Sequence, residues 1–295
     1  MSGPKNDRVT VACIQNCATP DLEANIAETK SMTREAAAKG ARLICLPEYF
    51  SCLDVENGRL KIPAFAEDRH PALPDYQALA DELGAWILAG SLPIEAPSGK
   101  GGGKGGGKAV NRSYLLDDSG RIVARYDKVH LFDVDLAEGE SYRESATIAP
   151  GGEAVVAATP WGRMGLSICY DLRFPHLYRA LAQAGAAILT VPAAFTRTTG
   201  EAHWHVLNRA RAIENGAFVI APCQNGVHAG GAATYGHSLI IDPWGEVLAD
   251  GGEESCVVLA EIDPAAVAKA RAMIPSLRHD RPFTLHPPSE VKAAE

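Results

Sequence analysis

The sequence predicts an α/β protein whose sheets mix parallel and antiparallel strands. Short apolar runs alternate along the chain with segments of helical periodicity, which is typical of strands connected through helices. Several neighbouring apolar runs are separated by only a few turn-forming residues, which indicates hairpins and therefore antiparallel pairs. Because no segment rich in proline and serine divides the 295 residues, we expect one domain over 1–295, with its core at about 8–275 and a tail at 276–295.

The first expected elements are a buried strand over 8–15 and a long helix. Thr19 is a suitable N-cap for this helix, and Pro20 suits its first position because a proline there leaves no N–H unpaired. Gly40 is the residue type that commonly ends a helix. Five residues recur at helical spacing and predict the buried face: Leu22, Ile26, Thr29, Thr33 and Ala36.

The next expected elements lead to the first hairpin. A short strand covers 42–46, a second helix covers 73–84, and a strand of sequence WILAGSL follows that helix. The hairpin covers 114–126 and turns at 118–120, where Asp-Ser-Gly favours a tight turn. The buried face of the second helix is expected at Tyr76, Leu79, Ala80 and Leu83.

The second half of the chain continues the alternation. Helices are expected near 174–184, 202–216 and 264–273. Strands are expected near 154–158, 163–168, 187–191, 217–222, 238–242 and 256–262. The sequences TPWG at 159–162 and DPWG at 242–245 place proline and glycine where hairpin turns favour them.

Composition narrows the class of partner. The chain is 46% hydrophobic and 22% charged, with a formal net charge of −8. This acidic balance disfavours a general nucleic-acid surface and an anionic membrane as partners. No apolar run approaches the roughly 20 residues that span a bilayer. The opening sequence MSGPKNDR also lacks an apolar signal core, so we expect a cytoplasmic protein without membrane or nucleic-acid partners.

The seven cysteines are odd in number and scattered through the chain. In a reducing compartment we expect them to be free thiols, most of them small buried hydrophobic residues. No Cys-x-x-Cys pair occurs, so the sequence offers no zinc-ribbon site. The cysteines are Cys13, Cys17, Cys45, Cys52, Cys169, Cys223 and Cys256.

A glycine- and lysine-rich segment at 98–110 partly matches a phosphate-binding loop. Residues 102–108 fit G-x-x-x-x-G-K, but Ala109 stands where the magnesium-binding hydroxyl belongs. The following residues predict a strand rather than the helix whose N-terminus would hold a phosphate. We therefore expect an exposed, flexible loop at this place.

Cys169 lies at a corner between an apolar strand and a helix, in the sequence GLSICYDLRFPHLYRALAQAG. A tight strand-to-helix turn lifts the corner side chain above the sheet edge and directs backbone N–H groups toward it. Those N–H groups, with the positive end of the helix, favour a thiolate and stabilise an oxyanion beside it. Cys169 is therefore a candidate nucleophile, and the alternative is a small buried hydrophobic residue.

Two other strand ends carry charges that a nucleophilic cysteine requires. Glu48 directly follows the apolar run LICLP, at the edge where the active sites of α/β sheets gather, and is a candidate general base. Lys128, in YDKVHLFDVD, closes one arm of the hairpin and would donate to a developing oxyanion. The alternatives are an ordinary loop glutamate and a solvated lysine.

Taken in order, these residues resemble the catalytic set of the nitrilase superfamily of carbon–nitrogen hydrolases. The resemblance extends from VACIQN to RHDRPF, nearly the whole chain. The family's Glu–Lys–Cys triad falls on Glu48 in LPEYF, Lys128 in DKVHLFD and Cys169 in ICYDLRFP, and its second glutamate falls on Glu144 in YRES. The resemblance implies a four-layer-forming αββα sandwich with mixed sheets. It also implies an αββα–αββα homodimer or larger assembly, formed through helix 202–216 and the helix after the cysteine.

Within the superfamily, the sequence is most similar to the branch of deaminated-glutathione amidase and ω-amidase. The similar stretches are CYDLRFP, PAAFTRTTGEAHWHVLNRARAIENGAFVIAP and YGHSLIIDPWGEVLA. Tyr170 and Asp171 follow the cysteine where nitrilases carry Trp-Glu, and the Cys-Asn-Asp-Arg-Arg pattern of carbamoylases is absent. The departures are an insertion at 100–108 and a glycine-rich loop at 225–236, near where such enzymes shape their substrate pocket.

The resemblance implies that the protein hydrolyses a small amide in two steps. Glu48 would take the thiol proton while Cys169 attacks the carbonyl, and Lys128 with the backbone N–H of Tyr170 would hold the oxyanion. Glu48 would then protonate the leaving nitrogen and activate the water that hydrolyses the thioester. Glu144 would position the substrate or Lys128. This chemistry requires no metal and no organic cofactor.

The favoured substrates of this branch carry a carboxylate, so the pocket requires a cation. Arg173, four residues after the cysteine, is the first candidate, and its alternative is a structural arginine that joins the helix to a loop. Arg197, in FTRTTG, is the second candidate. Tyr49 and Phe195 would line the pocket, unless they belong to the core.

The histidines give little support for a metal site. His203 and His205 are two residues apart on an expected helix, so their side chains face different directions. A zinc-binding pair on one helix requires a spacing of four. His228 and His237 lie further along the chain. We therefore expect no metal.

The favoured function is an amidase that acts on a deaminated glutathione-like substrate and releases an amine or ammonia. Other functions remain open. A metal-dependent hydrolase would use the histidines with Asp133 and Asp135, and would be sensitive to chelators rather than to thiol alkylation. A catalytically idle binding protein would be expected to lack a triad residue, but all three are present. The nearest enzymatic alternatives are an ω-amidase for α-keto acid amides such as α-ketoglutaramate, and an N-carbamoyl hydrolase.

Overall fold

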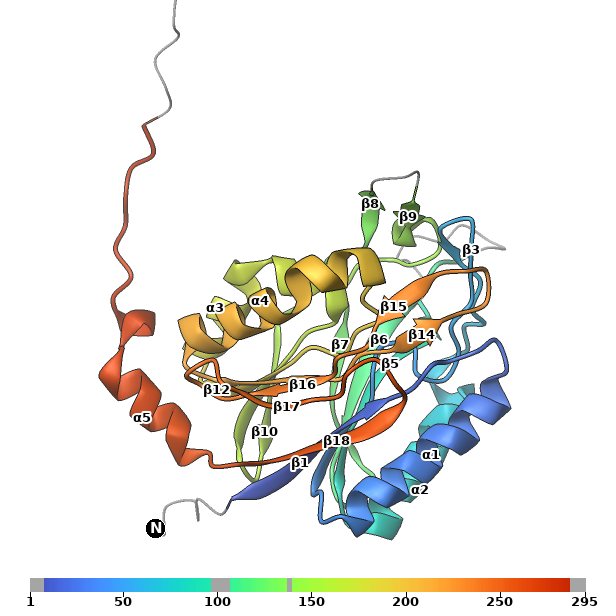
Figure 1. Ribbon diagram of the computed structural model, residues 1–295, viewed down its shortest axis with the longest axis horizontal. Coiled ribbons are helices and arrows are strands. Elements are labelled where there is room, and N and C mark those ends of the chain that lie inside the picture. Colours follow the sequence, from blue (N-terminus) through green and yellow to red (C-terminus); the bar gives the residue numbers. More distant parts are fainter. Residues whose placement is uncertain (1–7, 97–106, 137–139, 287–295) are drawn as a thin grey trace, which may run out of the picture.

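The computed structural model describes residues 8–96, 107–136 and 140–286, which include two sheets with helices on their outer faces (Figure 1). Within the described residues, the first six-stranded sheet has the order β18-β1-β2-β5-β6-β7. Its strands are β1 (Val9–Gln15), β2 (Leu43–Cys45), β5 (Trp86–Glu95), β6 (Ala109–Leu116), β7 (Ile122–Asp127) and β18 (Cys256–Ile262).

The second six-stranded sheet in the described residues has the order β10-β11-β12-β13-β16-β17. Its strands are β10 (Val155–Thr159), β11 (Gly162–Leu166), β12 (Ala186–Thr190), β13 (Phe218–Ala221), β16 (Leu239–Ile241) and β17 (Val247–Asp250). Both sheets therefore draw on strands that lie far apart in the sequence.

Each sheet is mixed, as the sequence predicts. In the first sheet, β2 pairs in parallel with β1 and β5, while β18 and β6 join antiparallel. In the second sheet, β12 pairs in parallel with β11 and β13, while β10 and β16 join antiparallel. In each sheet, the carboxyl ends of the parallel strands meet at one edge, so residues that follow those strands lie near one another.

The helices divide between the two sheets. Helices α1 (Leu22–Ala38) and α2 (Ala72–Leu83) contact strands of the first sheet, and α3 (Pro175–Gln183) and α4 (Arg197–Asn215) contact strands of the second. Figure 1 shows the two pairs on opposite sides of the sheets, with α5 (Ala265–Met273) following β18.

An apolar core fills the space between the sheets. Val11 and Cys13 of β1 belong to the same buried cluster as Met164 and Leu166 of β11, and none of these side chains is exposed. Burial of each large apolar side chain contributes about 1.5–3 kcal/mol to stability, so this core stabilises the packing of the two sheets against each other. Cys13 and Cys45 lie in this core as free thiols, which confirms the expectation of small buried cysteines.

Three short two-stranded sheets lie among the connecting segments and were not expected from the sequence. They pair β3 with β4, β8 with β9, and β14 with β15. Their bounds are β3 (Val55–Glu56), β4 (Arg59–Leu60), β8 (Asp133–Asp135), β9 (Ser141–Arg143), β14 (Asn225–Val227) and β15 (Ala233–Tyr235). The glycine-rich segment 225–236 therefore contains a small hairpin. Four short 3-10 helices complete the described elements: η1 (Glu67–Arg69), η3 (Glu144–Ala146), η4 (Cys169–Arg173) and η5 (Ser276–Arg278).

The start of α1 differs from the prediction. Asp21 is the N-cap, because its carboxylate accepts the N–H of Ala24 at 3.0 Å, and Pro20 lies outside the helix. Thr19 donates its backbone N–H and its hydroxyl to Asn25 Oδ1 instead. Gly40 has a φ of +93° just beyond the helix end, so its predicted role at the C-terminus is confirmed.

Three other boundaries differ from the prediction. Helix α4 begins at Arg197 rather than at 202, β5 extends to Glu95, and β11 ends at Leu166, three residues before Cys169. Residues 98–106 of the predicted glycine–lysine loop lie outside the described residues. The strand expected after it is confirmed, because β6 begins at Ala109.

Among the helices in 8–96, 107–136 and 140–286, none combines the length and the apolar character needed to cross a membrane.

Candidate active site

Cys169 lies in a strained corner between β11 and α3. Its φ is +48°, a conformation that non-glycine residues rarely adopt, and its N–H donates to the carbonyl oxygen of Pro192 at 2.9 Å. The sequence predicts a strand that passes directly into a helix. The structure instead places the 3-10 helix η4 between β11 and α3, and Cys169 is its first residue.

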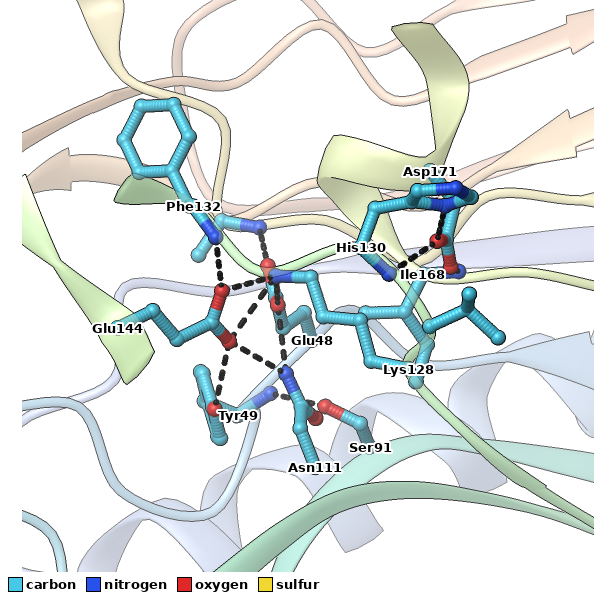
Figure 2. A network of polar contacts seen from close by, with 12 residues as sticks. Glu48, Tyr49, Ser91, Asn111, Lys128, His130, Phe132, Glu144, Ile168 and Asp171 are labelled. Carbon is cyan, nitrogen blue, oxygen red and sulfur yellow. Dashed lines mark hydrogen bonds and ion pairs between the residues drawn. The ribbon is translucent and has the colours of Figure 1, made fainter. Parts of the chain in front are cut away.

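Asp171 holds this corner from within η4. Its carboxylate accepts the N–H of Ile168 at 2.9 Å and the hydroxyl of Tyr126 at 2.7 Å. The other carboxylate oxygen accepts the N–H of His130 at 3.0 Å and lies 2.7 Å from Nδ1 of the same residue (Figure 2). The side chain is fully buried, so these contacts tie the Cys169 corner to the segment that carries Lys128.

Glu48 follows β2 and is fully hydrogen-bonded. Its Oε1 accepts Lys128 Nζ at 2.8 Å and Asn111 Nδ2 at 2.8 Å, and its Oε2 accepts the N–H of Ala194 at 2.8 Å. Gln224 holds the backbone around Glu48, because its Nε2 donates to the carbonyl oxygens of Glu48 and Tyr49. Tyr49 has a φ of +54°, so the backbone on this side of the cavity is also strained.

Lys128 lies between two carboxylates, as Figure 2 shows. Besides Glu48, its Nζ donates to both carboxylate oxygens of Glu144, at 2.9 and 3.1 Å. Glu144 also accepts the N–H of Phe132 at 2.7 Å and the hydroxyl of Tyr49 at 3.3 Å. The structure thus joins Glu48, Lys128 and Glu144 in one network, and Cys169 lines the same cavity as these three residues.

Asn111 is a member of this network that the sequence did not single out. Its amide group donates to Glu48 Oε1 at 2.8 Å and to Glu144 Oε1 at 3.3 Å. Asn111 lies inside β6, and its carbonyl oxygen accepts the N–H of Lys128 at 2.9 Å. The only sequence signal was a polar side chain within a strand that is otherwise mostly buried.

The electrostatics of the site follow from burial and from an excess of carboxylate. Burial raises the pKa of the Cys169 thiol well above its ordinary value, the charge of Glu48 raises it further, and Lys128 offsets only part of this. Burial by itself would lower the pKa of Lys128, but Glu144 and Glu48 raise it well above its ordinary value. The resting site therefore holds a neutral thiol beside a charged ammonium group.

These residues line a cavity of about 70 Å³. Tyr49, Tyr170 and Phe195 contribute aromatic walls, and Thr199 and Thr234 contribute hydroxyl-bearing ones. An outer hollow of about 780 Å³ adjoins the cavity, since Val55, Gly58, Tyr142, Ala232 and Ala233 line both. A substrate longer than a few atoms would therefore extend from the cavity into the outer hollow.

The two candidate arginines lie outside this cavity. The described residues that line it include neither Arg173 nor Arg197. The Arg173 guanidinium lies over the rings of Tyr170 and Phe195, 5.8 and 5.2 Å from their centroids, and 3.3 Å from His203 Nδ1. Arg197 lines the outer hollow, so it is closer to the path that a substrate would take.

The histidines that the structure describes do not form a metal centre in this cavity. His203 faces Arg173, and His228 contacts the carbonyl oxygen of Ala18 and the hydroxyl of Thr234. His205 and His237 both contact Asp250 instead. Asp133 accepts the N–H of Ser145, and Asp135 pairs with Arg143. Asp133 and Asp135, which the metal-hydrolase alternative would use, thus contact other residues. Among the described residues, the group of potential metal ligands that lie close together is His205, His237 and Asp250, and it includes neither of these aspartates.

Comparison with known proteins identifies close relatives over most of the chain. Residues 10–272 match the family described as carbon-nitrogen hydrolase. Deaminated glutathione amidase of Synechocystis sp. is 44% identical over 271 residues, which cover 91% of this chain and 96% of that protein. Human omega-amidase is 35% identical over 282 residues, which cover 95% of this chain and 92% of that protein.

Solved structures share the fold. The C. elegans NitFhit protein superposes with a TM-score of 0.82 at 35% identity, over 93% of this chain and 65% of that protein. This chain thus spans about two thirds of the NitFhit protein. An amidase mutant from Nesterenkonia sp. AN1, with the acetamide moiety of fluoroacetamide covalently added at its active-site cysteine, superposes with a TM-score of 0.72 at 25% identity. This match covers 93% of this chain and 98% of that one.

Proposed function

The chain belongs to the carbon–nitrogen hydrolase family of the nitrilase superfamily, and from this premise we propose that it hydrolyses a small carboxylate-bearing amide through a thioester on Cys169. The observation that carries the proposal is the arrangement of Glu48, Lys128 and Cys169 around one small cavity, with Glu48 Oε1 2.8 Å from Lys128 Nζ. The chain is thus an enzyme that acts on carbon–nitrogen bonds outside peptides.

The first step forms the thioester. Because the raised pKa keeps the Cys169 thiol protonated at rest, attack requires a base, and Glu48 lines the same cavity. Glu48 takes the proton as sulfur bonds to the carbonyl carbon, and Lys128 Nζ with the backbone N–H of Tyr170 holds the developing oxyanion. When the tetrahedral intermediate collapses, protonated Glu48 gives its proton to the nitrogen, and the amine or ammonia departs.

The second step consumes water. Glu48, ionised again, removes a proton from a water molecule whose oxygen attacks the thioester carbonyl. Collapse breaks the carbon–sulfur bond, releases a carboxylic acid and returns the proton to the sulfur. The balance is one amide and one water giving one acid and one amine, so no cofactor is needed in this proposal.

Glu144 and Asn111 position the reacting groups in this scheme. Glu144 holds the Lys128 ammonium through two contacts of 2.9 and 3.1 Å, and Asn111 bridges Glu144 and Glu48. A charged lysine held in one place provides a preorganised positive charge for the oxyanion, which costs no reorganisation during the reaction.

The favoured substrate is a deaminated glutathione-like amide, and α-ketoglutaramate, the substrate class of an ω-amidase, is the alternative. Hydrolysis of either compound transfers the same keto-acid acyl group to the cysteine, so the two differ only in the leaving group, cysteinylglycine or ammonia. The outer hollow of about 780 Å³ beside the cavity supports the larger leaving group. Arg197 lines that hollow and is the better placed of the two arginines for a substrate carboxylate, while the role of Arg173 stays a prediction.

The test compares the products of three substrates. Cysteinylglycine from deaminated glutathione, ammonia from α-ketoglutaramate and ammonia from carbamoyl-β-alanine are measured for the wild type, Cys169→Ala and Cys223→Ala. Cys223 is a matched control because it is also a buried cysteine after a strand of the second sheet. We expect a preference for deaminated glutathione that only Cys169→Ala abolishes.

Each other outcome has a definite meaning. A preference for α-ketoglutaramate would move the enzyme to the ω-amidase class and leave the mechanism intact. A preference for carbamoyl-β-alanine would identify an N-carbamoyl hydrolase. Full activity in Cys169→Ala would contradict the thioester mechanism.

The proposal also covers the protomer architecture, the oligomeric state and the cellular location of the protein. The contacts of α1 and α2 with one sheet, and of α3 and α4 with the other, support a four-layer αββα protomer in a single domain. We propose that two protomers pair through the α4 side as an αββα–αββα homodimer, and that the enzyme acts in the cytoplasm.

A further inference from the structure

His205, His237 and Asp250 gather beside the second sheet, and none of them lines the cavity. His205 lies on α4, His237 precedes β16, and Asp250 ends β17, so three elements contribute one side chain each. His205 Nε2 lies 2.9 Å from one Asp250 oxygen, and His237 Nδ1 lies 2.9 Å from the other. The three potential ligand atoms all lie within 4.8 Å of one another.

The chemistry of this group matches that of a transition-metal site. Imidazole nitrogen and carboxylate oxygen are ligands of Zn²⁺ at about 2.0–2.2 Å, and many zinc sites use three protein ligands and a water. Ligand atoms around such an ion lie about 3.3 Å apart, and the two imidazole–carboxylate separations here are 2.9 Å. The side chains are 33%, 21% and 34% exposed for His205, His237 and Asp250, which leaves a path for the ion and room for water.

Neighbouring contacts hold the three side chains in place. His237 has a φ of +51°, and its carbonyl oxygen accepts Trp204 Nε1 at 2.7 Å. The Tyr235 ring stacks on the His237 ring, with centroids 4.5 Å apart. Asp250 Oδ1 accepts the N–H of Gly252 at 2.9 Å. Contacts of this kind around metal ligands orient them before the ion arrives.

We propose that His205, His237 and Asp250 bind one divalent transition-metal ion of the Zn²⁺ type, with water completing its coordination. On the sequence alone, the candidate partner of His205 is His203 on the same helix, and their spacing of two residues predicts no metal site. The structure joins His205 to two residues that follow it by 32 and 45 positions, and His203 turns away toward Arg173.

An ion bound at this site would stabilise one wall of the active-site cavity. Helix α4 also carries Thr199, and β15 carries Thr234, and both threonines line the cavity. His205 lies six residues after Thr199, and His237 lies three residues after Thr234. Because α4 packs against β15 and β16, an ion that joins His205 to His237 and Asp250 would hold these elements together. The proposal does not depend on the substrate or on the thioester.

The test is a metal titration of chelator-treated protein. Zn²⁺ binding is followed by calorimetry and by thermal unfolding, and Co²⁺ binding by its visible absorption. The Cys169→Ala variant is titrated in parallel, because a thiol in the cavity would also bind these ions. We expect one equivalent bound by both proteins, and a Tm raised by about 5 °C at a hundredfold excess of Zn²⁺ over its Kd.

The variants separate metal binding from hydrogen bonding. His237→Asn keeps a polar group near Nδ1 and tolerates the positive φ, and His205→Gln keeps one near Nε2. Both should weaken binding by about 100-fold, while His203→Gln on the same helix should bind as the wild type does. No stoichiometric binding by the wild type, or equal binding by His237→Asn, would overturn the proposal.

Discussion

The side-chain amide of Asn111 lies between two carboxylates and donates to both of them. Without it, Glu48 and Glu144 would each lose a donor in a site where Lys128 is the only cation among the described charged residues that line the cavity. Hydrogen bonds to charged groups contribute more than neutral ones, and a buried carboxylate without partners is costly. At the scale of single residues, the site therefore depends on a neutral side chain as well as on the charged ones.

We predict that Asn111→Ala lowers kcat by about 10- to 100-fold, because hydrogen bonds to charged groups are worth about 1.5–3 kcal/mol. Steady-state kinetics measure this loss. Ser113→Ala is the matched control, since Ser113 is also buried in β6 and its hydroxyl has no hydrogen-bond partner among the described residues. Equal kinetics for Asn111→Ala and the wild type would refute the positioning role.

The pKa of the Cys169 thiol gives a second prediction. Burial and the charge of Glu48 raise this pKa above its ordinary value of 9.0, so the thiolate fraction stays small at neutral pH. Alkylation of the free enzyme by iodoacetamide should therefore continue to accelerate above about pH 9. Mass spectrometry assigns the rate to Cys169, with the partly exposed Cys17 as an internal reference. A rate that is already maximal at pH 7 would mean a resting thiolate instead.

At the scale of elements, the end of β2 is placed by the strand beside it. Gly90 of β5 lies against the backbone that carries Glu48: a Cβ on it would lie 2.0 Å from the carbonyl oxygen of Pro47 and 2.1 Å from that of Leu46. The next residue, Ser91, accepts the N–H of Tyr49 through its hydroxyl at 3.2 Å. The close approach of two backbones thus sets the position of the candidate base.

We predict that Gly90→Ala costs at least about 3 kcal/mol of unfolding free energy, because the backbone atoms it would meet cannot move without shifting the segment that holds Glu48. Urea unfolding measures the loss, and kcat should fall with it. Gly84→Ala is the matched control: Gly84 has a φ of +55°, and a Cβ on it would meet no described atom within 4 Å, so it should cost only about 1–2 kcal/mol. Equal costs for the two variants would contradict the steric argument.

At the scale of the whole molecule, the α4 side carries exposed apolar side chains. Val206 and Ile213 on α4 are 65% and 51% exposed, and Trp244 in the adjacent turn is 56% exposed. Arg209 Nε donates to the carbonyl oxygen of Gly245 at 2.9 Å, so this turn lies beside the helix. Exposed apolar side chains on one side of a protein are typical of an interaction surface, which supports the proposed homodimer.

We predict that the wild type has twice the chain mass in sedimentation equilibrium, and that the double variant Val206→Glu, Ile213→Glu sediments as a monomer. Two buried carboxylates at the interface would be costly to desolvate. Val123→Glu is the control, because Val123 is 42% exposed but lies on the edge strand of the first sheet. A wild type that sediments as a monomer, or a double variant that remains dimeric, would exclude this interface.

The order of strands and helices followed from the sequence, because periodicity and turn residues are local properties. The places of Glu48 and Cys169 shortly after strands were also predictable, since each follows an apolar run, although β2 and β11 end three residues before them. The short hairpins β3–β4 and β8–β9 were not, because strands of two or three residues carry too few positions for a period. The role of Gly40 was predicted correctly, but the N-cap of α1 lies two residues after the predicted one.

The sequence by itself determined the class of fold, the family and the residues that could carry the chemistry. The tertiary structure decided which side chains meet: Asn111 with Glu48 and Glu144, Asp171 with His130, and His205 with His237 and Asp250. It also placed Arg173 over two aromatic rings and Arg197 at the outer hollow. The physical reason is that most of these contacts join residues far apart in the chain, whose separation is set by strand pairing and by the packing of helices and connecting segments on the sheets, and not by any local pattern.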